Sequence, residues 1–194
     1  MRTIHYLLAL SFTFFAIYGC GTKNSSESFL REEVDLGYVQ HIAVLPFENH
    51  TKDDFAAERA RDLTITQVLA QKLFDAVDKG QVDSVLHEEA IEPGKPIDTL
   101  TLKRLGQRLK VEAFLMGSVD HAGENRMGTS SFPEISLTFR LVDSKSALLL
   151  WQASGHGSGY STVDRLFGLN PKDAFRVTMD LIDNLLSSVP RIAK

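Results

Sequence analysis

The sequence predicts an α/β sandwich, in which a mixed sheet containing an antiparallel meander is packed by helices. Three patterns predict it. His41 to Phe47 is a short apolar run that contains a proline, typical of a buried strand. From Ala57 to about Asp75, apolar residues recur at helical spacing. Ile135 to Leu141 alternates apolar and polar residues, and Leu148 to Ala153 returns after a turn, which predicts an antiparallel hairpin.

The other elements between these patterns follow the same reasoning. Glu48 to Asp54 is a polar loop, and Ala76 to Asp78 allows a short strand. Helical spacing predicts two further helices, over Gln81–Ile91 and around Leu102–Leu109, before a buried strand at Ala113–Val119. These strands are short and joined by polar loops. They therefore favour a peripheral domain over a pore subunit, whose spanning strands need ~9–11 residues.

The carboxyl-terminal part predicts a flexible connection and a last helix. Ser154 to Ser161 is rich in Gly and Ser, as expected for a strand exit. Ser161 with Asp164 resembles a capping box before a short helix. Asn170 as N-cap, followed by Pro171, predicts the start of the last helix. The apolar face of that helix is Phe175, Met179, Ile182, Leu185, Leu186 and Val189.

Length and charge limit the classes of function. The chain has 194 residues, which suits one domain with a core, and a formal net charge of −4. Its charges are scattered and no basic patch is interleaved with aromatic residues, which argues against a nucleic-acid partner. Cys20 is the only cysteine, so neither an intramolecular disulfide nor a cysteine-based metal site is expected.

The first residues have the order of an export signal. One arginine precedes Leu7 to Tyr18, an almost wholly apolar run of about twelve residues, and a spanning helix needs ~20. The following Ile17-Tyr18-Gly19-Cys20 resembles the lipobox of bacterial lipoproteins, although Tyr18 departs from the small residue usual there. The resemblance implies cleavage between Gly19 and Cys20 and a diacylglyceryl thioether on Cys20. A plain signal peptide and an uncleaved anchor are the alternatives.

The resulting organisation has three parts. Residues 1–19 are predicted to be a signal peptide, 20–38 a lipidated cysteine with a flexible tether, and 39–192 a single α/β domain. Gly21 to Ser28 is small and polar, as a tether requires. Gly21 directly after the cysteine implies, by enterobacterial sorting rules, the outer membrane and a domain facing the periplasm. The inner membrane is the alternative.

No motif predicts a catalytic centre, a cofactor or a metal. Gly155 to Gly159 lacks the third glycine of a dinucleotide fingerprint, and His87-Glu88-Glu89 lacks the second histidine of a metal helix motif. Trp151 is expected in the sheet core, with a ligand platform as the alternative. A pocket in which His121 or His156 meets a carboxylate would mark the enzyme alternative, a small hydrolase.

Several local phrases occur in a characteristic order along the chain. They are Ile42–Asn49, Leu73–Lys79, Val82–Glu88, Val111–Val119, Phe139–Asp143 and Leu149–Trp151. Together they resemble the superfamily that contains the curli-export lipoprotein CsgG, the penicillin-binding-protein activator LpoB and the amino-terminal domain of TolB. The resemblance implies a non-enzymatic envelope component that recognises protein partners, with a subunit of an oligomeric CsgG-like secretion complex as the alternative.

The functional prediction is a tethered adaptor. A lipid on Cys20 holds it to the membrane while its loops dock on another envelope protein or on a further copy of the chain. Loops on a rigid scaffold often carry recognition, so Gly123–Phe132 and Ser154–Tyr160 are the predicted docking loops, with plain flexible connections as the alternative. The candidate docking residues are Asn125, Arg126, Met127, His156 and Tyr160.

Overall fold

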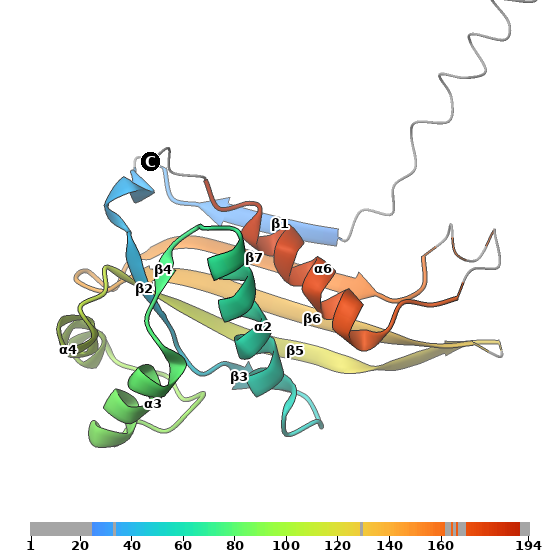
Figure 1. Ribbon diagram of the computed structural model, residues 1–194, viewed down its shortest axis with the longest axis horizontal. Coiled ribbons are helices and arrows are strands. Elements are labelled where there is room, and N and C mark those ends of the chain that lie inside the picture. The colour runs from blue at the N-terminus through green and yellow to red at the C-terminus, as the bar shows by residue number, and fades with distance from the viewer. Residues whose placement is uncertain are drawn as a thin grey trace, which may run out of the picture.

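The computed structural model describes residues 25–32, 34–128, 130–161, 164, 166 and 170–190. The predicted signal peptide and Cys20 lie outside these residues. The predicted fold class is confirmed, because a seven-stranded mixed sheet is packed by helices (Figure 1). No helix in the described ranges combines the length and the apolar composition that crossing a bilayer requires.

The strand order is β1-β7-β6-β5-β2-β4, with β3 also paired to β5. Adjacent strands in the β1-β7-β6-β5 part of the sheet are antiparallel, whereas β2 is parallel to both of its neighbours, β5 and β4. The predicted meander is therefore the β5–β6–β7 part of the sheet. The strands are β1 Ser25–Leu30, β2 His41–Val44, β3 Glu48–Asn49, β4 Asp75–Ala76, β5 Ala113–Met127, β6 Ser130–Asp143 and β7 Leu149–Ser158.

Helices cover both faces of the sheet over different areas. They are η1 Leu36–Tyr38, α2 Ala56–Ala70, α3 Lys79–Glu88, α4 Thr99–Leu109 and α6 Ala174–Leu186. α2 and α6 pack on one face, where their apolar residues join Leu137, Phe139 and Trp151 in the larger core. α3 and α4 cover the other face at one end, around Phe114 and Val142. The tip of the β5–β6 hairpin lies at the opposite end (Figure 1).

Aspartates cap three of the α-helices. Asp98 accepts hydrogen bonds from the backbone nitrogens of Leu100 and Thr101 at the start of α4. Asp173 accepts from the backbone nitrogen of Arg176 at 2.8 Å and so starts α6. The predicted cap at Asn170 is therefore wrong by three positions. The third aspartate is Asp78, at the start of α3.

The capping box predicted at Ser161 is present in its hydrogen bonds. The backbone nitrogen of Ser161 donates to Asp164 at 2.7 Å, and the backbone nitrogen of Asp164 donates to the Ser161 hydroxyl at 3.1 Å. Most of the short helix predicted after it lies outside the described residues.

The predicted flexible tether is too long. Ser25 to Leu30 forms β1, which pairs antiparallel with β7 from His156 to Trp151. Arg31 extends this attachment, because its backbone nitrogen donates to the carbonyl of Leu150 at 3.0 Å and its Nε to that of Leu149 at 2.7 Å. The folded part thus begins at Ser25 among the described residues, instead of at residue 39.

The strands of the meander are longer than predicted. β5 has 15 residues and β6 has 14, so most of the predicted loop Gly123–Phe132 is hairpin. β7 continues to Ser158 through the Gly- and Ser-rich run that was predicted to be flexible. The expectation of short strands was therefore wrong, and strand length no longer separates a peripheral domain from a pore subunit.

Tyr38 also fastens the segment between β1 and β2 to the meander. The Tyr38 hydroxyl donates to a carboxylate oxygen of Asp143 at 2.8 Å. Burial, together with the hydrogen bond and charge of Asp143, raises the pKa of Tyr38 to about 12. Burial alone would raise the pKa of Asp143, but hydrogen bonds, chiefly from Ser146 and then from Tyr38, lower it below its usual range.

Replacing the Tyr38 hydroxyl is expected to weaken this attachment in a pH-dependent way. Tyr38→Phe should lower the free energy of unfolding by about 1–2 kcal/mol at pH 7. Because the pKa of Tyr38 is raised on folding, the hydroxyl stabilises fully below pH 10.0 and loses its effect as the pH rises towards about 12. Urea unfolding at pH 7 and pH 11 checks this, with Tyr160→Phe as control. A wild-type advantage that stays constant over this range would contradict it.

Candidate functional site

The candidate docking residues do not form one surface. Asn125, Arg126 and Met127 end β5 at the tip of the β5–β6 hairpin, where all three are exposed. Met127 is 45% exposed, a large fraction for an apolar side chain. The hairpin turns at Gly128, whose φ of 61° favours glycine. This tip is the part of the prediction that the structure leaves open for contact.

His156 and Tyr160 have local partners instead. His156 lies inside β7, paired with Ser136 of β6 and Ser25 of β1, so Ser154–Ser158 is strand and not a loop. Its Nδ1 is 3.0 Å from the Ser136 hydroxyl. The Tyr160 ring packs at a tilt against Phe132, with ring centroids 5.4 Å apart. Docking by either residue stays a prediction, and the two rings give Tyr160 a structural role.

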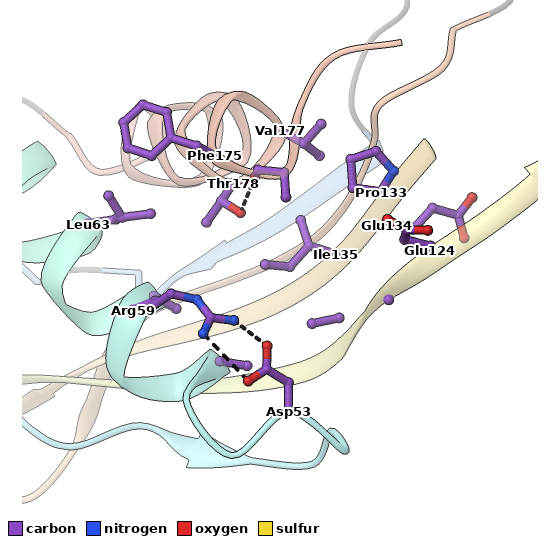
Figure 2. A pocket seen from close by; sticks show the side chains of 15 residues that line it. Asp53, Arg59, Leu63, Glu124, Pro133, Glu134, Ile135, Phe175, Val177 and Thr178 are labelled. Atoms are coloured by element: carbon purple, nitrogen blue, oxygen red, sulfur yellow. Dashed lines mark hydrogen bonds and ion pairs between the residues drawn. The ribbon is translucent and has the colours of Figure 1, made fainter. Parts of the chain in front are cut away.

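An apolar groove lies near the hairpin (Figure 2). It has a volume of about 450 Å³ and lies between α2, α6 and the outer parts of β5 and β6. Phe175, at the start of α6, lines it and is 58% exposed. Its other apolar lining residues are Ala56, Ala60, Leu63, Ala122, Pro133, Ile135, Ala174 and Val177. The helices thus leave part of the sheet uncovered at the hairpin end.

Charged groups stand at the rim of this groove. Arg59 of α2 forms an ion pair with Asp53, and its hydrogen bonds are the main cause that lowers the pKa of that carboxyl (Figure 2). Glu124 and Glu134 line the hairpin side. The Ser131 hydroxyl donates to Glu124 at 2.7 Å. Since Asp53 and Arg59 balance each other, the two glutamates give the rim a negative charge.

The sequence pattern does not predict this groove. The spacing of Ala60 and Leu63 predicted a buried helix face, and Phe175 was placed on the buried face of the last helix. Both helices do pack on the sheet, but the small side chains of Ala56, Ala60 and Ala174 fill little of the space between them. A run of alanines facing a hairpin is a weak signal, which only tertiary packing turns into a groove.

The sheet face opposite α2 and α6 carries a polar network beyond α3 and α4. Asp120 stands at a β-bulge and accepts hydrogen bonds from Ser118 at 2.7 Å and Thr138 at 2.8 Å. The Thr138 hydroxyl is also 3.0 Å from that of Ser154. These groups satisfy one another, which explains a wet strand face without invoking a ligand.

The Ser136–His156 pair is the nearest approach to a nucleophilic site. Such a site needs the histidine to be oriented by a third group, often a carboxylate. Among the described residues, no carboxylate forms an ion pair with His156 or His121. Within that same part of the chain, no cluster of three His, Cys, Asp or Glu residues is arranged to hold a metal ion.

Comparisons with known proteins place the fold. No protein-family model matches the chain, and no curated protein does. A PelC dodecamer from Paraburkholderia phytofirmans is 16% identical, with a TM-score of 0.61 over 88% of this chain and 100% of that one. Lipoprotein GNA1162 from Neisseria meningitidis is 18% identical, with a TM-score of 0.57 over 73% and 92%.

The predicted resemblance to LpoB has a weaker counterpart. The LpoB carboxyl-terminal domain from Salmonella enterica is 17% identical, with a TM-score of 0.45 over 67% of this chain and 87% of that one. At these identities the similarities to PelC and GNA1162 establish a shared fold. The resemblance to CsgG and TolB stays a prediction.

Proposed function

We propose that this protein is a lipid-anchored component of the bacterial envelope that acts by binding another envelope protein, without catalysis of its own. The anchor is the predicted thioether on Cys20. It holds the protein on the outer membrane, with the domain facing the periplasm. The partner binds the apolar groove between α2, α6 and the β5–β6 hairpin. The shared fold with lipoprotein GNA1162 supports the envelope setting.

The groove is the observation that carries this proposal. Apolar side chains line a hollow of about 450 Å³, and Phe175 stands 58% exposed beside it. Exposed apolar surface of this kind marks binding sites more often than isolated surface residues do. Confinement of both proteins to one membrane raises their effective concentration, so that a modest interface is sufficient.

The rim specifies the chemistry of the partner. Glu124 and Glu134 leave a negative charge on the hairpin side, while Asp53 is neutralised by Arg59. A complementary segment presents an apolar side chain to the groove and a basic side chain to the glutamates. Because the groove is formed by two helices and two strands, this site belongs to the folded domain and not to a connecting loop.

A second copy of the chain is the alternative partner. It is favoured by the PelC structure, which is a dodecamer, and PelC shares this fold. A homo-oligomer would place the same groove against basic side chains of the neighbouring copy. This alternative and a foreign partner are distinguished by the mass of the crosslinked product.

A photo-crosslinker at Phe175 is expected to capture the partner in intact cells. The adduct should fall about fivefold when Glu124 and Glu134 are both changed to lysine, because the rim then repels a basic segment. The control is a crosslinker at Leu100, which is 74% exposed on α4 at the other end of the domain. Equal adduct yields at the two positions, or an adduct indifferent to the charge reversal, would remove the groove as the site.

Lipidation of Cys20 is tested with protein from the same cells. The intact mass of membrane-extracted protein should correspond to a chain that begins at Cys20 and carries its lipid. Cys20→Ser should shift the protein from the membrane fraction to a precursor or released form. A mature chain that begins elsewhere, or that keeps a free thiol at Cys20, is incompatible with the anchored adaptor.

A further inference from the structure

The position of β1 limits how the domain can stand on a membrane. The limit rests on the proposed function, in which Cys20 carries the lipid. The connection from Cys20 to the first strand residue, Ser25, is five positions long. Five residues reach at most about 18 Å, at ~3.3–3.6 Å per residue. Ser25 therefore lies within that distance of the anchored cysteine.

The sheet register converts this limit into an orientation. Ser25 pairs with His156, which pairs with Ser136, so the three residues lie level across the sheet. From Ser136, β6 runs seven positions to Asp143, about 23 Å at ~3.3 Å per residue, towards the end covered by α3 and α4 (Figure 1). That distance exceeds the reach of the connection, so the domain cannot stand upright on its α3–α4 end.

The hairpin tip projects in the other direction. From Ser136 back to Ser130, β6 covers six positions, about 20 Å at ~3.3 Å per residue. This projection is similar to the full reach of the connection. If the strands point towards the membrane, the hairpin tip reaches the headgroup layer at about the depth of the anchored cysteine.

The composition of the tip fits that layer. The segment Asn125–Ser131 contains Arg126 and no acidic residue. Met127 is 45% exposed there. An arginine suits lipid phosphates and an apolar side chain suits the glycerol and upper acyl region. We propose that the β5–β6 hairpin tip is a membrane-contact site, in which Arg126 and Met127 touch the phospholipid headgroup layer.

The test uses the full, lipid-modified chain. Cys20 is the only native cysteine, so a lipid on its sulfur leaves the thiol of a Met127→Cys variant as the single site for a fluorescent label. The labelled protein is reconstituted into phosphatidylethanolamine–phosphatidylglycerol vesicles, with or without lipid that carries a shallow spin label. Lys103→Cys, exposed on α4, is the matched control, and Asn125→Cys is a second probe of the tip.

Quenching at Met127→Cys and Asn125→Cys should exceed that at Lys103→Cys at least threefold. Equal quenching overturns the proposal, as does strong quenching at a Phe29→Cys probe on β1 with none at the tip, which would mean that the domain lies on its edge. The wild-type protein distinguishes failure of the membrane-contact proposal from failure of the proposed lipidation. If it takes up the label and does not float with the vesicles, Cys20 is not lipidated and both proposals fall.

Discussion

Arg61→Ala is expected to lower the free energy of unfolding by about 3–5 kcal/mol, in the range measured when one partner of a buried ion pair is removed. The Arg61 side chain is only 5% exposed. It forms an ion pair with Asp83 of α3 at 2.7 Å, and its Nε and one terminal nitrogen donate to the carbonyl of Val44 at 3.0 and 2.9 Å. One guanidinium thus joins α2, α3 and the end of β2.

The loss has two causes. The alanine leaves the Val44 carbonyl and the Asp83 carboxylate without this donor, and it opens space beside the core. Because Asp83 is 43% exposed, water recovers part of its hydrogen bonding, which places the loss nearer the lower figure. For a domain of this size the midpoint of thermal unfolding should fall by about 2–4 °C per kcal/mol.

Thermal and urea unfolding, followed by the fluorescence of Trp151, measure the effect. Trp151 is the only tryptophan and is fully buried, so its emission reports the core directly. The control is Arg59→Ala, two positions earlier on α2, whose ion pair with Asp53 is exposed and screened by solvent, so its loss should change stability much less. Similar losses in the two variants would show that burial of Arg61 contributes nothing special.

Trp151→Ala is also expected to lower the free energy of unfolding strongly, by about 3–5 kcal/mol. The side chain is fully buried in the larger core, and its indole nitrogen donates to the Ser188 hydroxyl at 3.1 Å. The alanine removes the apolar contacts of β7 with α6 and also leaves a cavity. This position in the core confirms the core assignment of Trp151 made from the sequence.

Circular dichroism must follow this variant, because the fluorescent probe is lost. Trp151→Phe retains most of the apolar volume and should cost about 1–2 kcal/mol, which provides a measurement if the alanine variant does not fold. Leu148→Ala, at a position that is 50% exposed near the start of the same strand, should change stability by under about 1 kcal/mol. A loss in Trp151→Ala no larger than that control would contradict the assigned packing.

The fold class followed from periodicity, because burial on one face leaves a repeat in the sequence. Ile135 to Leu141 predicted the centre of β6 correctly for that reason. The outer part of the hairpin was missed, since residues from His121 to Met127 are mostly exposed and show no such repeat. Strand pairing there is sustained by the backbone and by continuity with the core.

β7 shows how tertiary packing overrides composition. Gly155 and Gly157 suggested a loop, yet both lie in the strand beneath α6. A Cβ atom on Gly155 would lie 3.0 Å from a methyl carbon of Leu181, so the glycine allows the helix to approach the sheet closely. The need for a small residue is set by a helix that begins almost twenty positions later, and local sequence does not reveal it.

The candidate site was predictable in part. Asn125 to Met127 were identified as an exposed polar turn, and their exposure at a hairpin tip agrees with that. The groove depends on how far α2 and α6 separate above the sheet, which no local pattern encodes. β1 was missed because Ser25–Leu30 is exposed on both faces as an edge strand.

The attachment of β1 also has a consequence for the order of folding. Arg31 bonds to Leu149, 118 positions later in the chain, and β1 pairs with the strand that begins there. Synthesis proceeds from the amino terminus, so the first strand made is among the last to find its partner. Long loop closure makes such pairing slow. A newborn chain therefore passes through a stage in which Ser25–Leu30 is unpaired while α2, α3 and α4 can already form, and the lipidation proposed for Cys20 would act on a chain whose β1 is not yet paired.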